Sequence, residues 1–295
     1  MQKKVTVRDV AREAGVSVAT VSYIMNNRQD VKISEQTRKK VLQIANLLDY
    51  TPSFAAKSLA TGRNNIIGVS YQLTGHSPSR DLALHSFVNQ LIEQLNRLKY
   101  DVLFIPVNPS GSNNPIARNI DGIIAVDLAD ADFRKLADSY MVPIIAVDMF
   151  VNDDLFYQVC TNIPMAVERA LKKYPDAIFV TESYSNEAYM KFLTEGIPSE
   201  QLYVYSPDRA NTFPTTLQNK KLIVLGAYLS LLLLPHTSQG NMISLVSGSY
   251  KELLPNTLET IDVEADKKAS LSINLLLNAL DRKFDLNHKH ILDIS

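Results

Sequence analysis

The chain has 295 residues, of which 46% are hydrophobic and 21% are charged. This length and apolar content exclude disorder as the default and favour a small head joined to a larger, two-lobed body. The net charge of −1 conceals an uneven distribution, because residues 1–63 contain 11 Lys and Arg against 5 Asp and Glu, whereas the remainder contains 19 against 26. A basic head on an acidic body predicts a polyanionic partner for the head.

The N-terminal sequence MQKKVTVRDV has no apolar run, so no signal peptide is expected. The most apolar stretch, residues 222–234, is too short to cross a bilayer. The single cysteine, Cys160, cannot form an internal disulfide, which is typical of a reducing compartment. We therefore expect a cytoplasmic protein with no membrane partner.

Residues 5–26 predict two short helices joined by a tight turn. Thr6 is followed three residues later by an Asp, a variant of the capping box that begins a helix. Gly15 stands where a helix ends in a left-handed residue, and Ser17 can cap the next helix. Val21 would then pack the second helix against the first. These spacings favour a helix-turn-helix over an ordinary helical hairpin.

A third helix, capped by Ser34, would complete the head with an apolar stripe of Val41, Ile44, Ala45 and Leu48. In such heads the second helix enters the major groove of DNA, and its first residues meet base edges. Its outward positions carry no Arg, Gln or Asn, so direct contacts would be to thymine methyl groups and through the Tyr23 hydroxyl. The predicted DNA-binding residues of the head are Thr6, Arg8, Ser17, Val18, Ala19, Thr20, Ser22, Tyr23, Asn26 and Tyr50.

The segment 51–63 predicts a hinge helix after the head. Pro52 breaks the third helix and can start another, which would run from Ser53 to Ala60. Ala56 and Leu59 are three residues apart and would share one face. A helix this short is marginal alone, but it could form when paired with its twin in a minor groove, with Leu59 as an intercalating wedge. The alternative is a plain interdomain linker.

The head and hinge sequences together resemble the lactose/galactose repressor (LacI/GalR) family of bacterial transcription regulators. The matching motifs are T-V-x-D-V-A-x-x-A-G-V-S-x-x-T-V-S-x-x-x-N at residues 6–26 and Y-x-P-x-x-x-A-x-S-L at residues 50–59. The resemblance implies an all-α helix-turn-helix head and hinge helix, followed by an α/β two-lobed body like the periplasmic binding proteins. It also implies a homodimer that binds a near-palindromic, double-stranded DNA operator. The hinge-helix roles pass to Ser53, Ala56, Lys57 and Leu59.

The body shows alternating apolar strands and helices, as a parallel α/β fold requires. Strands are expected near residues 65–70, 100–107, 121–125, 143–148 and 258–261, and helices near residues 82–98, 165–173 and 269–280. We expect a head at 1–50, a hinge at 51–63 and a body at 64–295. Within the body, the first lobe would take residues 64–160 and 262–283, and the second lobe 161–261 and 284–295.

A cleft between the lobes would bind an effector. Tyr71, Asp127 and Asp148 follow or end predicted strands and are the candidate cleft residues. The family's sugar-binding members carry an R-x-x-G-F segment and a G-F-D-D turn, which correspond here to residues 188–192 and 247–250, without the Arg and the Asp. The body could therefore respond to a sugar or sugar-derived molecule, to a protein partner, or to no effector.

No phosphate-binding G-x-x-x-x-G-K-[ST], no G-x-G-x-x-G and no G-x-S-x-G motif occurs. His288 and His290 form a tail pair without Cys or acidic support, which is a poor metal site. We therefore predict no catalytic residue, cofactor or metal. The preferred interpretation is an allosteric repressor, and the alternatives from other classes are a solute-binding protein and a regulator fused to an enzyme domain.

Overall fold

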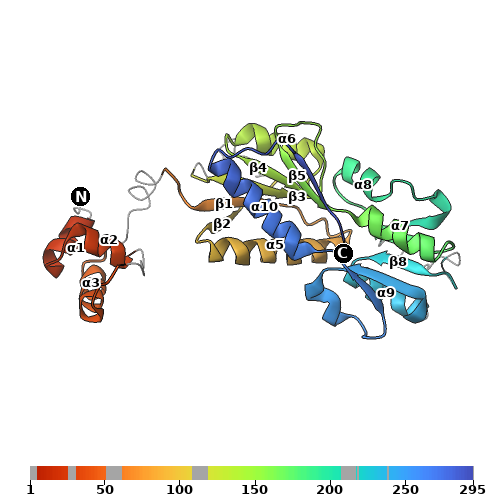
Figure 1. Cartoon of the computed structure of the whole chain (residues 1–295), viewed down its shortest axis with the longest axis horizontal. Coiled ribbons are helices and arrows are strands. Elements are labelled where there is room, and N and C mark those ends of the chain that lie inside the picture. Colours follow the sequence, from red (N-terminus) through yellow and green to blue (C-terminus); the bar gives the residue numbers. More distant parts are fainter. Residues whose placement is uncertain are drawn as a thin grey trace. The chain divides into compact units, whose positions relative to one another are not determined.

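The computed structural model describes residues 5–25, 31–50, 62–107, 119–206, 217, 219–237 and 239–294. The chain divides into two compact units, Met1–Asn64 and Asn65–Ser295, which we call the head and the body. Figure 1 shows helices α1, α2 and α3 of the head and the alternating helices and strands of the body.

The described residues of the head form three helices, α1 (Val7–Ala14), α2 (Val18–Met25) and α3 (Glu35–Leu47). Its core draws on all three helices and consists of Val10, Ala11, Ala14, Val21, Ile24, Val41 and Ala45. Val21 is fully buried. The predicted role of this residue in packing α2 against α1 is therefore confirmed.

Local hydrogen bonds set the ends of the head helices. The Asp9 carboxylate accepts from the Thr6 N–H and hydroxyl at 2.9 and 2.7 Å, which holds the start of α1. Gly15 has φ 66° and ψ 36°, the left-handed conformation that ends α1. Ser17 Oγ accepts from the Thr20 N–H at 3.0 Å and caps α2. Ser34 caps α3 in the same way. The start, turn and caps predicted for the head are all present.

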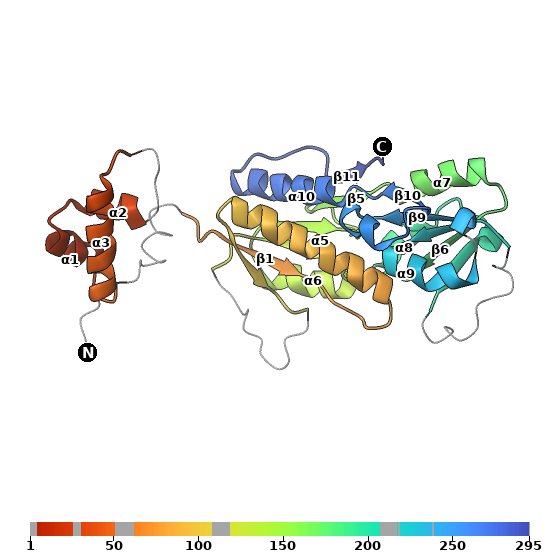
Figure 2. The ribbon, with the colours of Figure 1, turned by 90° about the horizontal axis from the view of Figure 1, so that it is seen from below.

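The first lobe of the body is a six-stranded parallel sheet of order β11-β5-β4-β3-β1-β2. Helices α5 (Pro78–Arg97) and α10 (Ala265–Leu280) pack on one face, and α6 (Asp130–Ser139) packs on the other (Figures 1 and 2). The strands are β1 (Ile66–Ser70), β2 (Asp101–Phe104), β3 (Gly122–Val126), β4 (Ile144–Val147), β5 (Tyr157–Thr161) and β11 (Lys289–Leu292).

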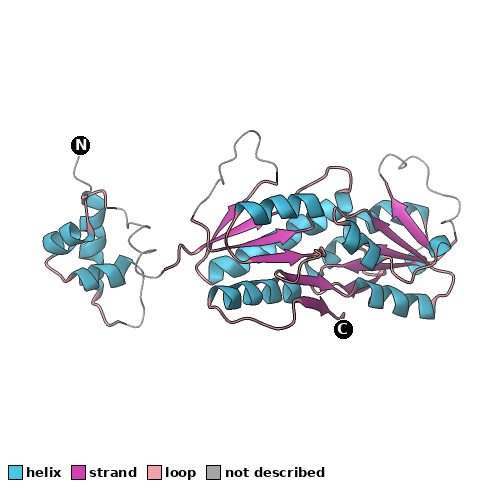
Figure 3. Cartoon of the chain, turned by 90° about the horizontal axis from the view of Figure 1, so that it is seen from above, coloured by secondary structure: helices cyan, strands magenta, loops and turns pink. Residues whose placement is uncertain are grey.

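The second lobe is a five-stranded parallel sheet of order β10-β9-β8-β6-β7. Helices α7 (Ile163–Lys173) and α8 (Glu187–Leu193) pack on one face and α9 (Ala227–Leu233) on the other. The strands are β6 (Ile178–Glu182), β7 (Leu202–Tyr205), β8 (Leu222–Leu225), β9 (Met242–Val246) and β10 (Glu259–Asp262). Figure 3 shows the strands of each lobe between their helices.

The assignment of residues 284–295 to the second lobe is wrong for β11. This strand pairs in parallel with β5 and extends the first sheet, with Gln158 N–H donating to the His288 carbonyl at 2.8 Å. The His288 ring also stacks on Tyr157 at 4.8 Å between centroids. Only the end of the tail reaches the second lobe, where Ile294 is buried in its core.

Helix α5 begins earlier than the sequence predicts, at Pro78 instead of residue 82. Proline suits the first turn of a helix because its missing N–H would have no intrahelical partner there. The additional turn carries Ser79 and Arg80, and both are buried. This turn lies at the boundary between the lobes.

Among the helices that the structure describes, none is long and apolar enough to cross a membrane. Cys160 is a free thiol buried in the core of the second lobe. Burial raises the pKa of this thiol to about 12, so it stays protonated and unreactive at neutral pH.

Candidate functional site

The outer face of α2 offers a small apolar surface at its N-terminal end. Val18 is 43% exposed, and Ala19 is exposed beside it. Ser22 and Tyr23 on the same helix are half-buried. The helix therefore exposes methyl groups at its first turn, and their contact with a DNA groove stays a prediction.

Polar groups flank this surface. The Ser17 and Thr20 hydroxyls are 2.9 Å apart at the start of α2. Arg8 is exposed on α1. The N-terminal end of a helix also carries unpaired N–H groups and a partial positive charge, both of which favour a phosphate. The geometry at the start of α2 thus suits contacts to a DNA backbone, and these remain predictions.

Tyr50 has a structural position in the head. It packs against the head core, and its N–H donates to the Ala45 carbonyl at 2.8 Å. Burial raises the pKa of its hydroxyl. The Thr6 hydroxyl likewise donates to the Asp9 carboxylate. The other predicted DNA-binding residues, Asn26, Ser53, Ala56, Lys57 and Leu59, lie outside the described residues, and so does the hinge helix.

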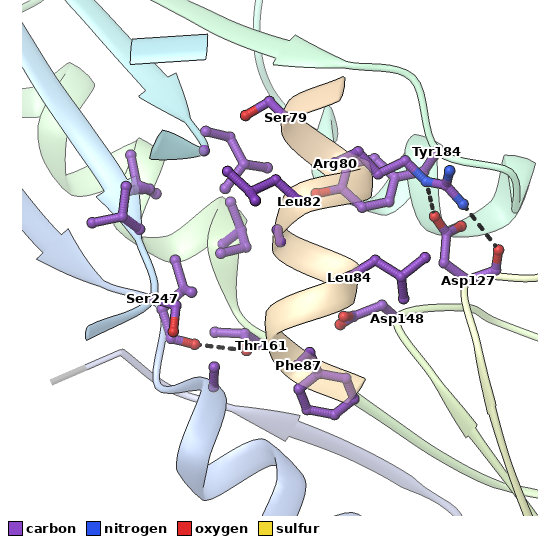
Figure 4. A pocket seen from close by; sticks show the side chains of 18 of the residues that line it. Ser79, Arg80, Leu82, Leu84, Phe87, Asp127, Asp148, Thr161, Tyr184 and Ser247 are labelled. Atoms are coloured by element: carbon purple, nitrogen blue, oxygen red, sulfur yellow. Dashed lines mark hydrogen bonds and ion pairs between the residues drawn. The ribbon is translucent and has the colours of Figure 1, made fainter. Parts of the chain in front are cut away.

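The body contains a cavity of about 90 Å³ between its lobes. Its wall combines the first turns of α5 with the carboxyl ends of β3, β4 and β6, where parallel sheets place their ligand sites. Figure 4 shows side chains of this wall gathered around α5. Leu82, Leu84 and Phe87 contribute apolar surface from that helix.

Arg80 is the most extensively bonded side chain of this wall. It extends from α5 toward Asp127, with which it forms a buried ion pair (Figure 4). Its Nη1 donates to Asp81 Oδ1 at 3.0 Å. Its Nη2 donates to Ser185 Oγ at 2.9 Å and, more weakly, to the Gln72 carbonyl at 3.4 Å. Arg80 thereby joins residues of the first lobe to a residue of the second.

Asp127 completes the same connection from the end of β3. Its Oδ1 accepts from the backbone N–H groups of Ser185 and Asn186 at 3.0 and 3.4 Å. Burial raises the pKa of Asp127 to about 6, although the Arg80 guanidinium acts to lower it. The residue also has φ 45°, an unusual backbone conformation for a residue with a side chain.

Asn186, in the second lobe, also bonds to the backbone of the first lobe. Its Nδ2 donates to the Leu128 carbonyl at 3.4 Å, and its Oδ1 accepts from the Phe150 N–H at 3.1 Å. The same Oδ1 caps α8 by accepting from the Tyr189 N–H at 2.9 Å. We call Arg80, Asp127, Ser185 and Asn186 the inter-lobe junction.

A second ion pair lies beside Phe87 of α5. Lys268, on the first turn of α10, contacts Asp148 at the end of β4. Its ammonium lies 4.7 Å from the centre of the Phe87 ring, within the range of a cation–π interaction. The Tyr189 hydroxyl donates to Asp148 from the second lobe at 3.4 Å. Both cationic side chains in the cavity wall are thus paired with carboxylates.

Glu182, at the end of β6, holds the beginning of α5. Its Oε2 accepts from the Arg80 N–H at 2.8 Å, which satisfies one of the unpaired donors of the helix N-terminus. Burial raises the pKa of Glu182. A carboxylate of the second lobe therefore caps a helix of the first.

The structure brings two of the three predicted cleft residues together. Asp127 and Asp148 line the cavity, whereas Tyr71 is absent from its wall and packs edge-on against Phe104 with ring centroids 5.0 Å apart. Sequence reasoning missed the cationic partners Arg80 and Lys268. The only local signal for Arg80 was the Ser-Pro pair that precedes it at the start of a helix.

The stretches that replace the family's sugar-binding motifs do reach the cavity. Tyr189 lines it from residues 188–192, and Ser247 and Tyr250 line it from residues 247–250. Tyr250 donates its hydroxyl to the Leu82 carbonyl at 3.3 Å. These positions therefore hold the lobes together through aromatic and hydroxyl groups in place of the Arg and Asp.

A family model matches the head of the chain. Residues 6–53 match the model described as bacterial regulatory proteins, lacI family. The head is therefore similar to the LacI family of regulators. The matched segment contains residues that build the head, namely Thr6, Gly15, Ser17, Val21 and Ser34.

Curated relatives extend the likeness into the body. The chain is 32% identical to the sucrose operon repressor of Klebsiella pneumoniae over 168 residues, which cover 54% of this chain and 48% of that protein. It is 35% identical to catabolite control protein A of Streptococcus mutans over 127 residues, which cover 41% of this chain and 36% of that protein. The chain thus spans half or less of the length of these two relatives.

Solved structures show the fold of the whole chain. The lac repressor dimer bound to operator and the anti-inducer ONPF superposes with a TM-score of 0.66 at 18% identity, covering 99% of this chain and 97% of that one. The transcriptional regulator CelR in complex with cellobiose superposes with a TM-score of 0.60 at 13% identity, covering 99% and 98%. The predicted combination of a helix-turn-helix head and a two-lobed binding-protein-like body is confirmed.

Proposed function

We propose that this protein is a sequence-specific DNA-binding repressor of transcription and not an enzyme. The observation that carries the proposal is the construction of α2. Ser17 caps this helix, Val21 anchors it in the head core, and Val18 and Ala19 remain exposed at its first turn. This arrangement suits insertion into a major groove. The family match over residues 6–53 and the basic charge of the head support it.

The protein would bind a near-palindromic operator as a homodimer, and the body would control operator affinity by shifting its two lobes. The lac repressor structure, described as a dimer bound to operator, supports this arrangement for a chain of the same fold. A solute-binding role is disfavoured, because it gives no place to the capped helical head.

Selection of binding sites from random duplexes, followed by gel shifts and footprinting, tests the proposal. Ala19→Glu should weaken specific binding, because it places a negative charge where the phosphates would approach. The substitution should leave the helix intact, since acidic residues suit a helix N-terminus. Gln43→Glu, at an exposed position of α3, introduces the same charge and is the matched control. Equal affinities of the two variants, or no selected sequence, would refute the proposal.

The hinge is a separate part of the proposal. Leu59 would act as the intercalating wedge, so Leu59→Ala should reduce both operator affinity and DNA bending. Circular-permutation gel shifts measure the bend. An unchanged bend and affinity would leave residues 51–63 as a linker.

A sugar effector, a protein partner and no effector are the alternatives for control of the body. The structures of CelR with cellobiose, and of a LacI-type regulator from Alkaliphilus metalliredigens complexed with D-xylulofuranose, support sugar binding by this fold. A thermal-shift panel of sugars and sugar phosphates tests it. A clear rise in the Tm with one of them would support a sugar effector, and unchanged melting across the panel would favour a different control.

A further inference from the structure

We propose that Arg80 serves as a built-in ligand of the inter-lobe cleft, so that the chain's own guanidinium holds the lobes closed and a sugar ring is excluded. All the contacts that carry this proposal lie within the body. Its regulatory meaning rests on the proposed function, because a change in lobe closure would alter operator binding only in a DNA-binding protein.

The bonding of Arg80 is that of a bridging ligand. The guanidinium group is almost completely buried and finds acceptors on both sides, Asp127 and Asp81 in the first lobe and Ser185 in the second. Two further backbone carbonyls, of Gln72 and Asp127, accept from Nη2. A planar fork of five donors that meets acceptors from two lobes fixes their separation and their relative orientation.

The backbone around Arg80 strengthens this bridge. Glu182 of the second lobe accepts from the Arg80 N–H. Next to it, Ser79 Oγ accepts from the Leu229 N–H at the start of α9, at 3.1 Å. Gly226 permits this approach, since a Cβ there would lie 2.2 Å from Ser79 Oγ. The first turn of α5 is thus held in the second lobe by hydrogen bonds from its side chains and its main chain.

Most polar groups in the remaining wall of the cavity are already bonded, and Glu182 Oε1 is the exception among the described residues. Sugar hydroxyls need polar partners to replace water. Here the Thr161 hydroxyl donates to the Val263 carbonyl at 3.0 Å, and Tyr250 donates to the Leu82 carbonyl. The cations Arg80 and Lys268 already face carboxylates. Beyond a single bond to Glu182 Oε1, a polyhydroxylated ring would therefore have to break bonds that join the lobes before it could make its own.

Solution scattering and melting of the full chain test the built-in ligand. Arg80→Ala should increase the radius of gyration and lower the Tm, because it leaves Asp127 buried without its partner. Millimolar methylguanidinium should reverse both changes by occupying the vacated site. Arg134→Ala removes an arginine whose ion pair with Asp130 is exposed on α6, and it should change neither quantity. Wild-type scattering from Arg80→Ala, or a failure of methylguanidinium to restore it, would overturn the proposal.

Ser185→Ala keeps the test decisive if Arg80→Ala does not fold. It removes only the second-lobe acceptor of the guanidinium and leaves the Arg80–Asp127 pair in place. Hydrogen exchange should rise in residues 78–84 and 185–193, which form the two sides of the junction. Wild-type exchange in both segments would contradict the role of Arg80.

Two further measurements separate this inference from the proposed function. Common monosaccharides should not raise the Tm of the wild-type chain, and a clear increase would refute the exclusion of sugars. Arg80→Ala should change affinity for the selected operator by roughly 5- to 150-fold, the range of typical allosteric couplings. An unchanged affinity would remove the regulatory meaning of the junction. If the wild-type chain binds no DNA, the proposed function fails, while scattering still decides whether Arg80 holds the lobes together.

Discussion

Ser79 and Gly226 lie so close together that a Cβ at position 226 would be 2.2 Å from Ser79 Oγ. Gly226 also has φ 111°, which disfavours any residue with a side chain. Gly226→Ala should therefore lower the free energy of unfolding of the body by about 2 kcal/mol or more. Urea denaturation measures the change. Gly240→Ala, at a position with no heavy atom within 4 Å of the new Cβ, is the control, and an equal effect of both would contradict the close contact.

Gly15 ends α1 with φ 66°, and open space surrounds it. Gly15→Ala should cost roughly 1–2 kcal/mol, because only the backbone conformation is strained and nothing clashes. Hydrogen exchange in residues 7–25 should accelerate about tenfold or more, while the body exchanges as in the wild type. Gly15→Asn should have a smaller effect, since Asn tolerates the left-handed region better. Equal acceleration by Ala and Asn would point to a cause other than φ.

Two serine caps in the head form a matched pair. Ser17→Ala and Ser34→Ala each remove a side-chain acceptor from a helix N-terminus, so each should destabilise the head by about 1 kcal/mol. Only Ser17 lies at the proposed DNA face. Gel shifts should therefore show a larger loss of operator affinity for Ser17→Ala than for Ser34→Ala. Equal losses would mean that both variants act through head stability alone.

Asp127 makes the stability of the body depend on pH. Its folded-state pKa is about 6 against a reference value of 3.8, so the folded chain retains a proton that the unfolded chain releases. This stabilising contribution is fully present below pH 3.8 and is lost as the pH rises toward 6. Its size is on the order of 3 kcal/mol.

Denaturation of the wild type and of Asp127→Asn across this range measures the contribution. The wild type should lose stability relative to Asp127→Asn as the pH increases, because Asn cannot ionise. Arg80 and Asp148 are the charged groups that act on this carboxyl, and they are present in both proteins. Parallel pH profiles would show that Asp127 does not titrate in this range.

The head was predictable because its determinants are local. Gly15, Ser17 and Val21 each act within a few residues of their position, so their spacing alone indicates the turn, the cap and the packing contact. The body strands were predictable for a related reason, because buried parallel strands are continuous apolar runs. Residues 122–126 and 144–147 are fully buried in the sheet.

The body site was only partly predictable because its contacts are distant in sequence. Asp127 could be placed at a strand end, but its partner Arg80 lies 47 residues away on a helix whose first turn was missed. The sheet position of β11 depends on pairing with β5, more than a hundred residues earlier. Edge pairing of this kind leaves no periodic signal in the local sequence, which explains the wrong lobe assignment for residues 284–295.

The order of synthesis has a consequence for this topology. The second lobe is one continuous segment between β5 and α10, whereas the first lobe waits for α10 and β11. Domains generally fold as they emerge from the ribosome. Most of the second lobe can therefore form while one face of the first sheet still lacks α10 and the β5 edge still lacks its neighbour, although Ile294 joins the second core only with the tail. The apolar face and the open edge of the incomplete first lobe would therefore stay exposed until α10 and β11 have been synthesised.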